Sequence, residues 1–197
     1  MMNNLIAHTK NYCLQLLKEN IADSLCFHNV EHTLQVYENV KVIGAHEQVA
    51  PKQMEFLMLA ALFHDVGHIK TYKGHEIFSA NMARTYLEGI AYPEKYIQEV
   101  ERIIKATQMP QQPTDLLEQI ICDADLFHLG TEDFLTRNSA LRKEWEVIFN
   151  KYFTDPQWQA LNEDFLNCHK YHTSYCKVNL APGKQKNREA LKNCCSL

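Results

Sequence analysis

Apolar residues recur every three or four positions along most of this 197-residue chain, and short polar segments interrupt them. This spacing predicts amphipathic helices, and no stretch shows the alternation that predicts a half-buried strand. Residue types that favour helix starts precede several of the apolar stripes. We therefore predict an all-α bundle, with helices that begin near Leu5, Asn29, Pro51, His75, Pro93, Thr114, Thr131, Asp155 and Ala181.

The local sequence also predicts where some of these helices are capped and how far they extend. The helix from Thr131 is expected to run through Tyr152, because apolar residues stay in register up to that position. The basic segment after Ala181 predicts a peripheral helix. The residues expected to cap helices at their N-termini are Asn29, Thr114 and Asp155.

The most continuously apolar segment, 57–63, predicts a helix that is buried among other helices. It leads directly into His64 and Asp65, and Gly67 is expected to take a positive φ that ends the helix. An imidazole beside a carboxylate in a buried position is costly unless both are paired. One such pair is also explained by caps and hydrogen bonds within a core, so a metal site needs further ligands elsewhere.

Composition limits the class of protein. With 46% hydrophobic and 22% charged residues, the chain is typical of a globular protein, and its length fits one domain over 1–197. The formal net charge of -4 argues against a nucleic-acid partner, and no segment predicts a membrane span. Nothing in the sequence predicts the oligomeric state.

Seven cysteines without a Cys-x-x-Cys pattern, and a start without the features of a leader, favour a cytoplasmic protein with reduced thiols. The terminal segment Cys194-Cys195-Ser196-Leu197 has the outline of a prenylation motif. Its middle residues are not aliphatic, so we expect no lipid anchor there.

Two further groups of metal-type ligands lie near predicted chain reversals. His28 and His32 stand one helical turn apart, and Asp123 and Asp125 follow an apolar helix. Separate His and Asp groups at the ends of several apolar helices are hard to explain as surface decoration. Together with the pair after residue 63, they favour a divalent metal site over isolated helix caps.

The segments 27–36, 63–68 and 123–126 resemble, in that order, the successive motifs of the HD superfamily, an all-α family of metal-dependent phosphohydrolases. The similarity covers approximately 27–130, and helices within 131–197 are expected to pack on this core. The turn at 74–76 and the segment 169–173 further resemble a bacterial branch of HD phosphohydrolases. Asp123 is then either an acceptor behind the ligands or a helix cap. The metal ligands that the resemblance implies are His32, His64, Asp65 and Asp125.

The resemblance also implies a reaction: hydrolysis of a phosphate mono- or diester by a metal-activated water, with nucleotides among the small phosphorylated substrates. The choice among Mn, Mg, Fe, Co, Ni and Zn is not predicted. Asp65 is expected to act in catalysis as well as in metal binding. His28 matches the proton-donating His of the cyclic-nucleotide phosphodiesterases, although Phe27 replaces their Tyr. It is therefore either a proton donor or a hydrogen-bonded core histidine.

Two alternatives to this enzyme stay open. One is a non-catalytic HD module that binds a metal or nucleotide, and the other is an HD-type di-iron oxygenase. Three basic residues near the predicted site either bind the remaining phosphate charge or are solvated surface. They are Lys70, Lys73 and Arg84.

The number of metal ions is predicted from a departure from the family pattern. HD proteins with two metals add His ligands between the His-Asp doublet and the last Asp, and His68 and His75 are available here. However, the segment 105–108 ends in Gln108, where those relatives have a His. A neutral Gln oxygen is a weaker ligand for most transition metals. We therefore predict one tightly bound ion, with His68 and His75 behind its ligands or against the substrate phosphate.

Overall fold

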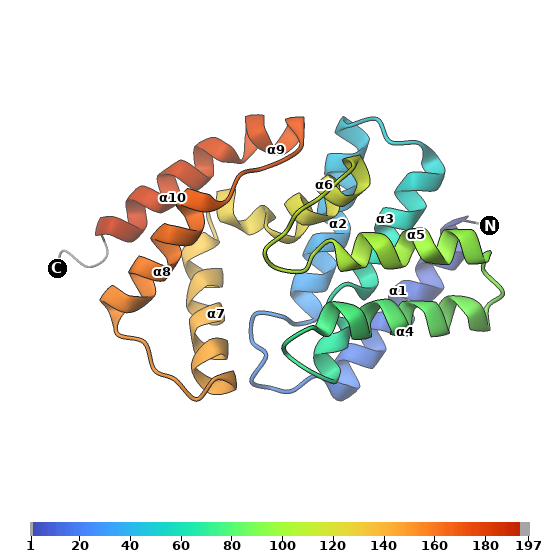
Figure 1. Ribbon diagram of the computed structural model, residues 1–197, viewed down its shortest axis with the longest axis horizontal. Coiled ribbons are helices and arrows are strands. Elements are labelled where there is room, and N and C mark those ends of the chain that lie inside the picture. Colours follow the sequence, from blue (N-terminus) through green and yellow to red (C-terminus); the bar gives the residue numbers. More distant parts are fainter. Residues whose placement is uncertain (1, 194–197) are drawn as a thin grey trace.

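The computed structural model describes residues 2–193, and every regular element within them is a helix (Figure 1). The all-α prediction is confirmed. In this part of the chain no helix is long and apolar enough to cross a bilayer, and the segment 194–197 with its two cysteines lies outside the described residues. The elements are α1 (Met2–Asn20), α2 (Val30–His46), α3 (Pro51–Phe63), η1 (Val66–Ile69), α4 (His75–Gly89), α5 (Glu94–Lys105), α6 (Leu116–Asp125), η2 (Phe127–Gly130), α7 (Phe134–Ile148), α8 (Asp155–Cys168), α9 (Ser174–Asn179) and α10 (Ala181–Asn193).

Helix α3 is the centre of the bundle, and α1, α2, α4, α5 and α6 all pack against it. The side chains from 59 to 63 are fully buried, as the apolar sequence predicts. A helix that is apolar around its circumference is stable only where neighbours cover every face. The position of its C-terminal end, from which His64 and Asp65 follow, is therefore fixed by the surrounding helices.

The predicted caps are close to the observed ones. Asn29 caps α2 as expected. The other two caps are displaced by one residue: Asp115 rather than Thr114 caps α6, and Thr154 rather than Asp155 caps α8. Asp115 and Thr154 are the caps because the side-chain oxygen of each accepts a backbone N–H of the first helical turn.

The C-terminal helices differ from the prediction in two places. Helix α7 ends at Ile148, followed by Asn150 with a positive φ of 47°, so Tyr152 lies beyond the helix and is 82% exposed. Helix α10 lies at the edge of the molecule, as predicted (Figure 1), but it also docks on η2, a contact that the sequence did not predict. A Cβ on Gly183 would lie 2.0 Å from the carbonyl oxygen of Gly130.

Gly67 is required because the backbone of α4 packs closely against it, and not because it adopts the positive φ that the sequence predicts. The structure records a positive φ at Gly74 but not at Gly67. A Cβ on Gly67 would lie 2.0 Å from the backbone oxygen of His75, closer than any side chain tolerates. The absence of a side chain therefore lets η1 pack directly on the first turn of α4, which brings His68 against His75.

Asp123 connects α6 to the segment that precedes α9. Its carboxylate accepts hydrogen bonds from the backbone N–H of His172 (2.9 Å), and from the backbone N–H (2.8 Å) and hydroxyl (2.6 Å) of Thr173. Asp123 is fully buried. It is therefore an anchor for the C-terminal segment, and the expectation that it stands behind the metal ligands is corrected.

We expect Asp123→Ala to lower the free energy of unfolding by about 2–4 kcal/mol, because buried donors lose a charged acceptor. Urea unfolding followed by circular dichroism measures this change. Asp164→Ala, at an exposed position of α8, is the matched control and should change stability by less than about 0.5 kcal/mol. A stable Asp123→Ala protein that has lost its metal would instead show that Asp123 is a ligand.

Candidate metal centre

Three helices bring His32, His64 and Asp125 together, from the first turn of α2, the residue after α3 and the last residue of α6. His32 Nε2 lies 3.1 Å from Asp125 Oδ1 and 3.4 Å from His64 Nε2. The ligand atoms of the three residues all lie within 4.8 Å of one another. The structure thus brings together residues that are far apart in the sequence, at distances that an ion could bridge.

Asp65 lies between this group and a second set of imidazoles. Its Oδ2 atom is 3.2 Å from His64 Nε2 and 3.4 Å from His32 Nε2. Its Oδ1 atom is 3.2 Å from His75 Nε2 and 3.8 Å from His68 Nε2. The two oxygens of one buried carboxylate therefore face two different groups of histidines.

These contacts determine the charges at the centre. Burial alone would raise the pKa of Asp65, but the charge and hydrogen bonds of His64, with a hydrogen bond from His75, bring it well below its usual range. Burial opposes protonation of His64, yet the carboxylates of Asp65 and Asp125 raise its pKa well above the usual value. Burial dominates at His32 and lowers its pKa. The carboxylates are therefore ionised, and binding of a cation would release the proton of His64.

The residues present fit a divalent cation. In the described part of the chain, both ring nitrogens of His68 are buried without a hydrogen-bond partner. Burial of such atoms without a partner costs about 1–3 kcal/mol each, and a cation would bind the one nitrogen of the neutral His68 ring that carries a lone pair. Imidazole nitrogens and carboxylate oxygens form a donor set that suits Zn, Mn, Fe, Co or Ni.

Arg137 of α7 lies behind His32 and is absent from the sequence prediction. Its Nη2 donates to His32 Nδ1 at 3.0 Å, and its guanidinium stacks on the ring of Phe27 at 4.4 Å. A guanidinium only donates hydrogen bonds, so the neutral His32 ring carries its proton on Nε2. Binding of an ion through Nε2 would therefore move this proton to Nδ1 and displace Arg137.

Glu144 of α7 is the second group that the sequence prediction missed. Its fully buried carboxylate accepts the backbone N–H groups of Phe27 (2.8 Å) and His28 (3.1 Å), the hydroxyl of Tyr72 (2.9 Å) and Nδ1 of His28. Nδ1 of His28 is thus occupied, and Nε2 is the ring nitrogen left free. The seven-residue spacing of Arg137 and Glu144 places both on one helix face, a signal that the apolar stripe of the same helix obscured.

The predicted phosphate-binding cations are not among the groups that the structure brings together. Lys70 and Lys73 are exposed, and neither forms an ion pair with a described residue of the centre. Arg84 bonds to carboxylates of α4 and α5. It follows His75 by nine residues on α4, or about 13 Å along the helix. A phosphate contact of Arg84 is therefore not supported, because its guanidinium is already paired with carboxylates.

A cleft of about 190 Å³ opens beside His32 and Asp125. Its other walls carry amide, hydroxyl, imidazole and aromatic side chains. Among the described residues that line it, none is Lys or Arg. The lining consists of His32, Gln35, Val36, Asn39, Ala124, Asp125, Phe127, His128, Thr131 and Asp133.

Comparison with known proteins agrees with this geometry. A family model described as the HD domain matches residues 29–130, just over half of the 197-residue chain. Searches of curated proteins and of solved structures each found no match. The matched segment includes the four residues that the resemblance assigns as metal ligands: His32, His64, Asp65 and Asp125. The finer likeness to a bacterial branch stays a prediction. The chain belongs to the HD domain family.

Proposed function

We propose that the protein is a metal-dependent phosphohydrolase that cleaves a phosphate mono- or diester, with nucleotides among the candidate substrates. The observation that carries this proposal is a group of metal-type ligands beside an open cleft: buried His32, His64 and Asp65, with half-buried Asp125. Membership of the HD domain family supports it, because this family consists mostly of metal-dependent hydrolases.

The residues of the centre can be given roles in such a reaction. His32, His64, Asp65 and Asp125 would hold a divalent cation, which lowers the pKa of a water and polarises a phosphoryl oxygen when it is bound. Asp65 and Asp125 are ionised, so either carboxylate can accept the proton that the attacking water gives up. Asp65 is buried, whereas the side chain of Asp125 is 19% exposed beside the cleft. Burial therefore strengthens the electrostatic contacts of Asp65 most.

The cleft suggests what lies beyond the scissile phosphate. Gln35 and Asn39 offer neutral amides, and Phe127 offers an aromatic face. Burial lowers the pKa of His128 to about 3, so its ring is neutral. Such a wall suits an uncharged group with hydrogen-bonding atoms, such as a sugar or a nucleoside, better than a second phosphate.

We expect Asp65→Ala to remove the bound metal and the hydrolytic activity together while the helical content stays unchanged, because the apolar core does not depend on this carboxylate. Elemental analysis, circular dichroism and a phosphatase assay measure the three properties. Asp164→Ala is again the matched exposed control. Wild-type metal content in the Asp65→Ala protein would contradict the ligand assignment.

We further expect EDTA-treated protein to be inactive and to recover when Mn²⁺, Mg²⁺, Co²⁺, Ni²⁺, Fe²⁺ or Zn²⁺ is returned, with kcat/KM falling at least about 100-fold in Asp125→Ala. The substrates should include aryl and alkyl phosphates, a phosphodiester and a set of nucleotides. Bound metal without turnover of any of them would favour the non-catalytic module. Tightly held iron with an optical signature and oxygen-dependent chemistry would favour the oxygenase.

A further inference from the structure

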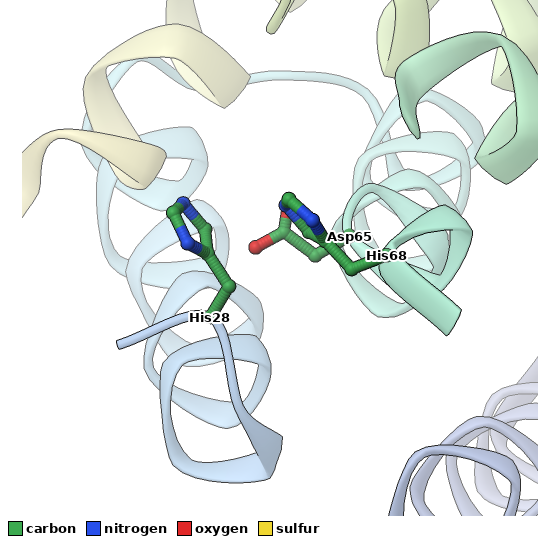
Figure 2. Close-up of side chains that lie close together, drawn as sticks. All are labelled: His28, Asp65 and His68. Atoms are coloured by element: carbon green, nitrogen blue, oxygen red, sulfur yellow. The ribbon is translucent and has the colours of Figure 1, made fainter. Parts of the chain in front are cut away.

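His28, Asp65 and His68 form a second group of ligand atoms, separate from the group of His32, His64 and Asp125. The ligand atoms of these three residues also lie within 4.8 Å of one another. Figure 2 shows His28, which precedes α2, facing Asp65 and His68 across a short gap. Asp65 contacts both groups through different oxygens, so the two groups share one carboxylate.

His28 has the arrangement of a metal-binding histidine. Its Nδ1 hydrogen-bonds to the fully buried carboxylate of Glu144. That contact keeps the proton on Nδ1, so the lone pair of Nε2 is free to bind an ion. A carboxylate behind the far ring nitrogen is the usual way in which proteins orient metal-ligating histidines.

His68 is buried without any evident reason to be a histidine. Its side chain is 1% exposed, and neither ring nitrogen has a hydrogen-bond partner among the described residues. The ring stacks on His75 at 3.7 Å between centroids and lies 4.5 Å from the ring of His28. An apolar ring would fill this position without the penalty of two unpaired nitrogens. The choice of a histidine therefore points to a ligand.

His75 adds a further donor at the edge of this group. Its Nδ1 donates to the backbone oxygen of Tyr72 at 3.0 Å, and its Nε2 lies 3.2 Å from Asp65 Oδ1. Gln108, whose presence led us to predict a single ion, is exposed and is not among these ligand atoms. The ligand atoms of this second group therefore do not include the residue at position 108.

We propose that His28, Asp65 and His68 hold a second divalent cation, with Asp65 bridging it to the cation at His32, His64 and Asp125. A catalytic role for this pair of ions rests on the proposed phosphohydrolase function. In such reactions two ions about 3.5–4 Å apart stabilise both the attacking and the leaving oxygen of a phosphoryl group. His28 is then a metal ligand and does not donate a proton to the leaving group.

Equilibrium dialysis of the metal-free, full-length protein against Mn²⁺, with the bound metal counted by elemental analysis, tests this proposal. The wild-type protein should bind two equivalents, and His28→Ala and His68→Phe should each bind one. His8→Ala, at an exposed position of α1, is the matched control and should bind two. One equivalent in the wild type, or two in both His28→Ala and His68→Phe, would overturn the proposal.

The thermal stability of His68→Phe separates a ligand from a structural histidine. Because phenylalanine removes two unpaired nitrogens, the metal-free variant should melt at or above the temperature of metal-free wild type, while it gains less stability from added Mn²⁺. A variant that melts well below metal-free wild type and still binds two ions would show that His68 only supports the fold.

Glu144→Gln tests the support behind His28. We expect the affinity of the second ion to fall about 10–100-fold while that of the first stays near the wild-type value. Unchanged affinity at both sites would contradict the role assigned to this carboxylate.

The metal count tests the second site, and the assay on phosphate esters tests the proposed function, so each proposal can be rejected without the other. Two bound ions without hydrolysis would support the second site and reject the proposed function. Activity with one ion, together with a loss in His28→Ala that is confined to poor leaving groups, would reject the second site and return His28 to the role of proton donor.

Discussion

The buried carboxylate of Asp65 is the interaction on which the candidate metal centre depends. An isolated ionised carboxylate in a protein interior is strongly unfavourable, so its surroundings must supply compensating charge or hydrogen bonds. Here His32 and His64 approach one oxygen, and His68 and His75 approach the other. The apolar helix α3 fixes Asp65 at its end, and the remaining helices bring histidines to it.

The centre also depends on a helix outside the segment that matches the HD domain. Arg137 and Glu144 lie on α7, beyond residue 130. Arg137 holds the far nitrogen of His32, and Glu144 holds the far nitrogen of His28. Glu144 therefore orients a ring whose other nitrogen is free to bind an ion, whereas Arg137 holds His32 only in the metal-free state. A protein trimmed to the matched segment would lack both contacts.

Local periodicity was sufficient to predict the α-helices except α9, and the resemblance was sufficient to predict which residues gather at the end of α3. Both depend on short segments whose pattern is visible in the chain. The contacts that the sequence could not predict join distant segments. Asp123 binds backbone groups some 50 residues away, and the buried face of α7 carries a cation and a carboxylate in place of an apolar stripe. The requirement for glycine at position 67 likewise became visible only from the approach of α4.

The most direct test of the account is the anomalous X-ray scattering of crystals soaked with Mn²⁺, since it locates ions without reference to activity. The account predicts a peak bounded by His32, His64, Asp65 and Asp125 at ligand distances of about 2.0–2.2 Å. An absence of scattering there in excess Mn²⁺, with His32 still hydrogen-bonded to Asp125, would contradict it.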